Sequence, residues 1–531
     1  MPAEFDVAIA GGGHNGLVCA AYLAAAGRSV VILERRDLLG GCAVTEEIWP
    51  GYRVSTGAYL VSLMQERIVE EMRLREYGYH LEAKDPPFFS PFPDGRYLFT
   101  WQDGERTHEE IAKFSRRDAD ALPRYEAHLE RLAVIVESLV AVTPPPLPPT
   151  GAGDLWDWLK FAARFRGLSA RDIAALAKVF TQSAADFLDD WFESGEVKVT
   201  LATDGVIGAN GGPRTPGTAY ILLHHCMGGV NGLRGVWGFV RGGMGAVAGA
   251  MAACCRARGV QIRTGAAVRS ISVRNGRAAG VVLEDGEEIR ARFVASNLDP
   301  KVTFLKLLDE AALDPEFVTA IRRYRCEGTS AKINLALNGL PEFKALPGAP
   351  GPQHRATMHI CPDIDYIERA WDDAKYGRPS QAPLLEMTAP TMYDPSLAPP
   401  GKHVLGIFLQ YAPYTLRDAD WDRLREPFLE RVLSLVEEYA PNIRGIIEHA
   451  QVLTPLDMER RFGITGGNIF HGEMSLDQMF FLRPVAGWSR YRTPVQGLYL
   501  CGSGAHPGGG VMGVPGRNAA REMLRDMSRP R

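Results

Sequence analysis

The stretch "FDVAIAGGGHNGLVCAAYLAAAGRSVVILE", Phe5 to Glu34, decides the fold that the sequence predicts. The apolar run Phe5–Ala10 predicts a buried strand of a parallel sheet. The Ala- and Leu-rich run Asn15–Ala26 predicts a helix that ends at Gly27, and a second apolar strand is expected over Ser29–Leu33. Together they form a βαβ-type unit whose glycines lie where the strand turns into the helix.

The glycine pattern G-x-G-x-x-G at this turn predicts a dinucleotide site. Gly11 permits the tight turn, Gly13 lets the backbone approach a pyrophosphate, and Gly16 lets the helix pack on the strand. The free N–H groups at the start of the helix then face the phosphates. Glu34 ends the second strand, where its carboxylate can accept from both ribose hydroxyls and disfavours the 2′-phosphate of NADP.

Two further glycine-rich segments favour FAD over NAD as the dinucleotide. In "RRDLLGG" the pair Gly40-Gly41 would again bring bare backbone against the pyrophosphate. Near the C-terminus, "CGSGAHPGGGVMGVPGRNAA" places six glycines between Gly502 and Gly513 directly before a helix. A loop of this kind suits the second half of a long cofactor, while the alternative is a flexible surface turn.

The nucleotide-binding features return in two later parts of the chain. A glycine turn and small-residue helix begin at Gly242, a hairpin turns at Asp285-Gly286, and strands are expected at Phe293–Ser296 and Leu498–Cys501. The intervening segments mix aromatic loops, helices and strands. We therefore predict an α/β protein with a Rossmann-like FAD-binding domain, discontinuous in sequence, and a mixed α+β substrate-binding or lid domain. The FAD-binding domain comprises 1–75, 235–300 and 485–531, and the second domain comprises 76–234 and 301–484.

Composition excludes several classes of partner. The chain of 531 residues has 59 basic and 63 acidic residues, and no dense basic block suggests nucleic acid. Its eight cysteines are scattered without a CxxC pair, so we expect no disulfide framework, no metal site and a reducing, cytoplasmic compartment. Only four residues precede the first strand, and no apolar run reaches the ~18 residues that span a bilayer, so neither a targeting peptide nor a membrane span is expected.

Several longer segments carry a family resemblance. "GGGHNGLVCAAYL", "ERRDLLGG", "GGMGAV", "VASNLDP" and "GLYLCGSGAHPGGGVMGVPGRNAA" resemble the phytoene desaturase-like FAD-dependent oxidoreductases, which include bacterial phytoene desaturases, carotenoid isomerases and retinol saturase. The segment "GNIFHGEMSLDQMFFLRP", Gly467 to Pro484, is most similar to two subgroups. These are the pyridine nucleotide-disulfide oxidoreductase domain-containing protein 2 group and the desaturase-like β-carotene ketolases. The resemblance spans nearly the whole chain.

The resemblance implies FAD as cofactor and assigns its contacts. The adenosine diphosphate half would be held by Gly11, Gly13, His14, Asn15, Gly16, Glu34, Arg36, Gly40 and Gly41. Val268 would meet the adenine through its backbone, and Gly502, Ser503, Val511 and Met512 would line the ribityl chain and the flavin ring. The related amine oxidases usually have an acid where Ser503 stands, so the ribityl contact at that position departs from their pattern.

A flavin takes up a hydride, so dehydrogenation of a C–C bond also needs a proton acceptor nearby. His506, inside the flavin-facing loop, is the first candidate, and its alternative role is a hydrogen bond to backbone. His471 and Asp477, in "FHGEMSLDQ", are the next candidates, although Asp477 also suits a helix cap. His224-His225 follow the strand-like "AYILL", and a core role is preferred for them.

The stretch Asp154–Gly167 predicts an amphipathic helix with Leu155, Trp158, Leu159, Ala162 and Phe165 on one face. This face either packs on the protein as part of a lid, which we prefer, or dips into a membrane surface that holds a lipophilic substrate.

The function predicted first is an FAD-dependent oxidoreductase that acts on an apolar, isoprenoid or carotenoid-like substrate by hydride transfer to flavin N5. Two alternatives stay open, a flavin amine oxidase and a flavoprotein with a regulatory or binding role. Oxygen and a quinone are both open as the electron acceptor.

Overall fold

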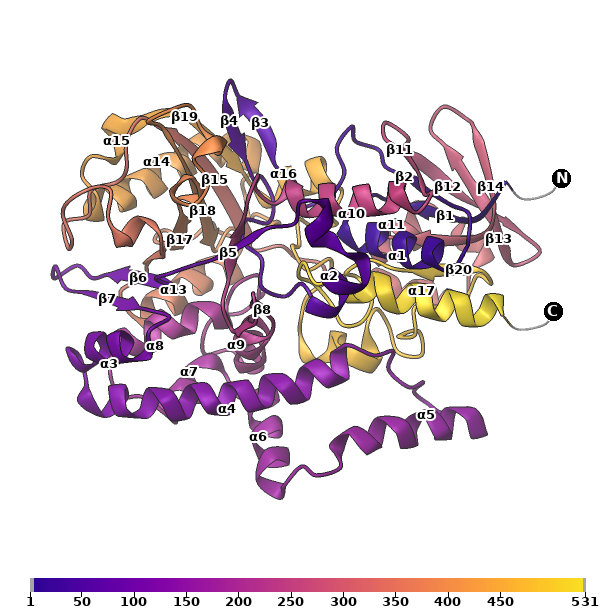
Figure 1. The fold of residues 1–531 in the computed structure, drawn as a ribbon, viewed down its shortest axis with the longest axis horizontal. Helices are drawn as coiled ribbons and strands as arrows, with labels where there is room; N and C mark the ends of the chain where they lie inside the picture. Colours follow the sequence, from indigo (N-terminus) through magenta and orange to yellow (C-terminus); the bar gives the residue numbers. More distant parts are fainter. Residues whose placement is uncertain (1–3, 529–531) are drawn as a thin grey trace.

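The computed structural model describes residues 4–528, and Figure 1 shows two β-sheets beside each other with a group of helices below them. Each of the two large sheets has seven strands. This arrangement confirms the predicted α/β class.

The first sheet contains the strands of the opening sequence stretch. Its strands are β1 (Phe5–Ala10), β2 (Val30–Leu33), β11 (Gln261–Arg263), β12 (Val268–Arg274), β13 (Arg277–Leu283), β14 (Glu288–Ser296) and β20 (Leu498–Leu500). The order is β11-β2-β1-β14-β13-β12, and β20 pairs with β14. β11, β2, β1, β14 and β20 pair in parallel, whereas β12 and β13 join through antiparallel hairpins.

Three helices rich in small residues pack together beside this sheet. They are α1 (His14–Ala25), α10 (Gly245–Ala257) and α17 (Val514–Met527), and α1 contacts both of the others. Gly516 of α17 lies so close to α1 that a Cβ there would be 2.0 Å from the Asn15 carbonyl oxygen. The predicted first strand, first helix, second strand and C-terminal strand are all confirmed, with ends that differ by at most one residue.

The second sheet lies beside the first (Figure 1). Its strands are β6 (Phe88–Pro91), β7 (Tyr97–Thr100), β15 (Ser330–Leu337), β16 (Thr357–Ile360), β17 (Leu384–Thr388), β18 (His403–Gln410) and β19 (Ile447–Leu453). The order is β19-β15-β18-β17-β16-β6-β7, antiparallel except between β16 and β6. All eight residues of β15 are buried, and a hydrophobic core lies between this sheet and helix α14 (Trp421–Tyr439).

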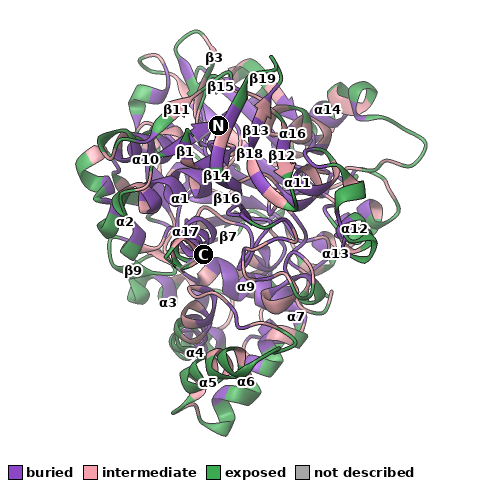
Figure 2. Ribbon diagram, turned by 90° about the vertical axis from the view of Figure 1, so that its right-hand side faces the viewer, coloured by how far each residue is buried: buried purple, intermediate pink, exposed green. Residues whose placement is uncertain are grey.

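The helices below the sheets come from residues 104–226. They are α3 (Gly104–Ala112), α4 (Arg116–Val140), α5 (Ala152–Ala162), α6 (Ala170–Thr181), α7 (Ala184–Asp189), α8 (Gly195–Ala202) and α9 (Thr218–Cys226). Figure 2 shows that the tip of this group, at α5 and α6, is largely exposed. The expectation that "AYILL" is strand-like is wrong, because this run lies inside the buried helix α9.

The segments of the two predicted domains interlock. Strand β5 (Leu81–Ala83) pairs with β10 (Gly238–Val240), and the hairpin of β3 (Glu46–Trp49) and β4 (Tyr52–Val54) packs on Ala336 and Val404 of the second sheet. The hairpin therefore leaves the first sheet although it belongs to segment 1–75. The domain division itself stays a prediction.

Candidate functional site

A cavity of about 590 Å³ runs from the glycine turn after β1 to the second sheet. Gly11, Gly13 and Glu34 line one part of it, and Ser503 and Gly510 line another. Phe88, Ile207, Trp237, Phe408, Ile469 and Phe470 give it an apolar wall on the side of the second sheet and the helices. The cavity therefore joins the predicted cofactor site to a second chamber.

The glycine turn is close-packed against a residue that the sequence analysis did not single out. Asn297 follows β14, and its backbone N–H donates to the Ala10 carbonyl at 2.9 Å. A Cβ at Gly13 would lie 2.5 Å from Asn297 Nδ2, and one at Gly16 would lie 2.5 Å from the Gly11 carbonyl oxygen. Gly13 also lies beside Gly41, whose Cβ would be 3.4 Å from the Gly13 Cα. Glycine is therefore required at these positions by the packing of the protein, as well as by the approach of a ligand.

Glu34 holds the same turn from the other side. Its carboxylate accepts from the backbone N–H of Gly12 at 2.8 Å and of Arg36 at 3.0 Å, and the residue is buried. The Arg36 side chain forms an ion pair with Glu46 at 2.6 Å and lines the cavity together with Val268. A carboxylate has about four lone-pair directions, so Glu34 retains acceptor capacity for ribose hydroxyls.

The C-terminal glycine loop meets the start of α1. The Asn15 side-chain amide donates to Ser503 Oγ at 3.1 Å, and this contact joins residues that are far apart in sequence. Gly510 and Val511 line the cavity, whereas Gly502 and Met512 do not, and Gly502 abuts the Asn297 carbonyl. His14 lines the cavity at the first position of α1.

These residues fit a dinucleotide with a second aromatic half. Helices α1 and α17 both begin at a glycine without a side-chain cap, so their first N–H groups are free for phosphate or ring oxygens. Asn15 Oδ1 and His14 Nε2 are buried with no hydrogen-bond partner within residues 4–528. The predicted contacts at both ends, apart from Gly16, Gly502 and Met512, thus line one cavity.

We expect Gly13→Val to give colourless protein. The new side chain would collide with Asn297 and block backbone approach to the pyrophosphate. The matched control is Gly249→Val on α10, where a Cβ meets nothing within 4 Å. The measurement is the ratio of flavin absorbance to protein after gentle purification. A yellow Gly13→Val protein would contradict the predicted pyrophosphate site at Gly13.

The three catalytic candidates do not lie together. Only His471 lines the cavity. His506 is buried outside the lining, with its ring against Phe480 at a centroid distance of 6.1 Å. Asp477 lies away from the cavity, 63% of its side chain is exposed, and it forms an ion pair with Arg325. Asp477 and His506 are therefore not placed to take a proton from a substrate in this cavity.

His471 has the properties of a proton acceptor held in place by its backbone. Its φ of 58° is unusual for a residue with a side chain, and such strain is concentrated at functional sites. Burial, and then Arg483, lower its pKa to about 4, so the imidazole is neutral at pH 7. Its Nδ1 has no hydrogen-bond partner within the described residues. The Tyr324 hydroxyl donates to its carbonyl at 3.1 Å.

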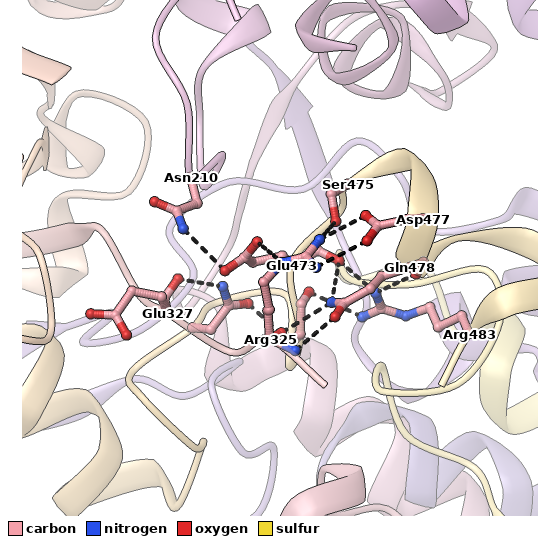
Figure 3. Close-up of polar contacts among 10 residues, drawn as sticks. Asn210, Arg325, Glu327, Glu473, Ser475, Asp477, Gln478 and Arg483 are labelled. Carbon is pink, nitrogen blue, oxygen red and sulfur yellow. Dashed lines mark hydrogen bonds and ion pairs between the residues drawn. The ribbon is translucent and has the colours of Figure 1, made fainter. Parts of the chain in front are cut away.

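The segment around "SLDQ" is a polar scaffold, as Figure 3 shows. Arg325 pairs with Glu473 at 3.0 Å and with Asp477 at 2.7 Å, and its N–H donates to the Gln478 side chain. Arg483 is fully buried and donates to five backbone carbonyls, which belong to Phe470, Gly472, Glu473, Gln478 and Ser503. Arg483 thereby ties the segment that carries His471 to the C-terminal glycine loop.

Arg483→Met should destabilise the protein and release FAD at a lower temperature. The change leaves five carbonyls without their donor, and unsatisfied buried groups cost about 1–3 kcal/mol each before relaxation. Arg423→Met is the matched control, because the Arg423 side chain is 89% exposed, its partner Asp420 is 51% exposed, and surface ion pairs contribute about 0–1 kcal/mol. Thermal unfolding followed by flavin fluorescence distinguishes them, and equal effects would contradict the buried role of Arg483.

Among the ionisable cavity residues that sequence reasoning missed, four come from the second sheet, the helices and the strand β5 region. They are Lys84, Asp204, Lys332 and Glu386. Lys332 lies inside β15, donates to the carbonyls of Ser55 and Gly57, and has its pKa lowered to about 7 by burial. The only sign of this cluster in the sequence is a lysine within the apolar run "SAKINLAL", because the four residues are far apart in the chain.

Within residues 4–528 no group of three or more His, Cys, Asp or Glu side chains is placed to hold a metal ion. No helix in this described range combines the length and apolarity that a membrane crossing requires.

Comparisons with known proteins identify the family and the fold. The family model described as flavin containing amine oxidoreductase matches residues 16–524. The chain is 44% identical to pyridine nucleotide-disulfide oxidoreductase domain-containing protein 2 of Rattus norvegicus, covering 99% of this chain and 94% of that protein. It is 26% identical to a lycopene-forming phytoene desaturase of a Paracoccus species, covering 99% of both. The solved cyclohexylamine oxidase of Brevibacterium oxydans shares the fold with a TM-score of 0.57 and 16% identity, covering 99% of this chain and all of that one.

Proposed function

Since the chain belongs to the flavin containing amine oxidoreductase family and is an FAD-dependent oxidoreductase, we propose that it dehydrogenates a largely apolar, isoprenoid or polyene-like substrate. The observation that carries the proposal is the continuity of the cavity, which leads from the cofactor contacts into a chamber walled by aromatic side chains. FAD, when bound, supplies the hydride acceptor at N5.

The residues of this chain would orient the substrate, exclude water and take up a proton. The aromatic wall includes Tyr59, whose ring stacks on Phe408 at 5.8 Å, and His225, whose ring lies 5.9 Å from Trp237. His471 is the neutral base proposed for the proton, because it lines the cavity with an unpartnered ring nitrogen. The eight free cysteines support a reducing compartment, and we propose the cytoplasm.

Amine oxidation is the weaker alternative. An amine oxidase site on this scaffold calls for two aromatic walls, one on either side of the substrate. Tyr59 and Phe408 instead contact each other, which leaves no slot between their rings. Lys84 and Lys332 also line the cavity together with Asp204 and Glu386, so this group of four offers no excess of negative charge to an ammonium group.

Anaerobic flavin bleaching tests the proposed function. We expect isoprenoid or polyene compounds to bleach the flavin and amines to leave it oxidised. His471→Ala should slow bleaching by about 100-fold if the ring is the base, and by less than about tenfold if it only positions the substrate. Asp477→Asn and His506→Gln are matched controls that should bleach at the unmodified rate. Faster bleaching by amines than by every apolar compound would overturn the proposal.

We also propose that α5 touches a membrane surface from which such a substrate is taken. In the structure, one part of the α5 helix packs on the protein and another part is exposed. Trp158 packs on Phe481 at 5.2 Å, as a lid would, whereas Leu155, Trp156 and Leu159 are 56%, 58% and 61% exposed. Figure 1 shows α5 standing away from the sheets. The exposed Lys160 and Arg164 on this segment suit anionic headgroups.

The double variant Trp156→Ser/Leu159→Ser should lose vesicle binding. Removing two exposed apolar side chains should lower co-sedimentation with phosphatidylglycerol-containing vesicles by about tenfold or more. Ile173→Ser on α6 is the control, because Ile173 is 54% exposed and lies on a different helix. Equal losses in both proteins would show that α5 is not the contact.

A further inference from the structure

The cavity contains a cluster of charged side chains that the apolar wall does not explain. Lys84 follows β5, Asp204 lies in the turn after α8, and Glu386 belongs to β17, so three separate elements bring them to one chamber. Lys84 and Glu386 are only 2% and 5% exposed. Burying such groups is costly, and they persist where they are paired or where they bind something.

Glu386 is already satisfied by the protein. Its carboxylate accepts from the Tyr59 hydroxyl at 2.7 Å and lies 3.7 Å from His359 Nε2. Burial alone would raise the pKa of Glu386, but His359, Lys84 and Tyr59 together hold it below its usual value. Glu386 therefore carries the negative charge that balances Lys84 and has little need of a ligand.

The Lys84 ammonium makes fewer hydrogen bonds than it has donors for. Its ammonium donates to Thr357 Oγ1 and lies over the Phe88 ring at 4.8 Å, and it has no other hydrogen-bond partner within residues 4–528. An ammonium has three N–H donors. Burial lowers its pKa to about 8, against the opposing effects of Glu386 and Asp204, so the group stays mostly charged at neutral pH.

Asp204 is the second unsatisfied group. Its carboxyl lines the cavity and accepts no hydrogen bond in the described part of the chain. Its backbone is fixed, because His225 Nδ1 donates to the Asp204 carbonyl at 2.8 Å. Burial and the nearby Glu386 raise the pKa of Asp204 to about 7. Lys84 and Asp204 line the same cavity and affect each other's pKa, yet they form no ion pair with each other in the described part of the chain, so a ligand group between them can complete both.

The charges decide which ligand fits. A cation would meet Lys84 and Lys332, whereas an anion would meet Glu386 and Asp204, so a full charge of either sign is disfavoured. A hydrocarbon would leave Lys84 and Asp204 unsatisfied. A hydroxyl can accept from the ammonium and donate to the carboxylate at the same time.

We propose that Lys84 and Asp204 form a subsite for an uncharged hydroxyl group on an otherwise apolar substrate. The inference rests on the proposed function, because it assigns the polar end of the molecule that the aromatic chamber would hold. The substrate would then be an isoprenoid-type alcohol, in contrast to a pure hydrocarbon, an amine or an acid.

A matched set of four probes tests this subsite. Geraniol, geranylamine, geranic acid and myrcene have the same type of isoprenoid chain and differ in the terminal group. Binding to the FAD-loaded protein is followed by thermal stabilisation and by perturbation of the flavin absorption spectrum. We expect geraniol to bind about tenfold or more tightly than the other three, as a hydrogen bond to a charged group predicts.

Two variants remove the subsite with little change of shape. Lys84→Met and Asp204→Asn should each reduce the preference for geraniol over myrcene to below about threefold, while the affinity for myrcene and the FAD content stay the same. The control makes the same two changes at the surface pair Lys178 and Asp190, which are joined at 2.9 Å. Lys178→Met and Asp190→Asn should keep the full preference.

The outcomes separate this inference from the proposed function. Equal binding of geraniol and myrcene, tighter binding of the amine or the acid, no binding of geraniol, or an unchanged preference in both variants would overturn the subsite. Bleaching by apolar compounds with any of those results would leave the proposed function standing. A preference for geraniol that is lost in both variants, without bleaching by any compound, would support the subsite and contradict the dehydrogenase.

Discussion

The structure depends on close backbone contact around Asn297. This residue follows the central strand β14, and its side chain lies within 2.5–3.6 Å of the positions that Cβ atoms would occupy at Gly11, Gly13 and Gly16. Gly502, from the other end of the chain, abuts its carbonyl. Two glycine loops distant in sequence are therefore packed on one residue, which fixes both halves of the cofactor site relative to each other.

The second constraint is the cost of burying charge. Arg483 is fully buried, and its charge is compensated by hydrogen bonds to five carbonyls, which link the loop with His471 to the loop with Ser503. Lys84, Glu386 and Lys332 are buried around the adjoining chamber, where Tyr59 contacts both Glu386 and Lys332. The cavity is thus lined by aromatic side chains and by hydrogen-bonded charged groups. Such fixed surroundings can position a substrate that itself offers few polar contacts.

The parts of the fold that the sequence predicts are those with local physical causes. The apolar run Phe5–Ala10 and the Ala-rich helix after it follow from periodicity alone, and the glycines fix where one turns into the other. "AYILL" shows the limit of this reasoning. A short, fully apolar run suits a buried strand or a buried helix. In this protein the run packs against α4 as part of the helix α9.

The residues of the candidate site also differ in how far the sequence predicts them. Glycines that must approach a dinucleotide are visible in sequence because few other residues tolerate such contacts, whereas side-chain chemistry depends on where the chain folds back. His506 is within four residues of Gly510, yet its ring faces Phe480, because the loop turns between them. Lys84 and Asp204 are more than a hundred residues apart and have no motif, and only the closing of the second sheet over the helices brings them together. The proposed substrate subsite is therefore formed by contacts between distant segments, whereas the predicted cofactor contacts lie in short motifs.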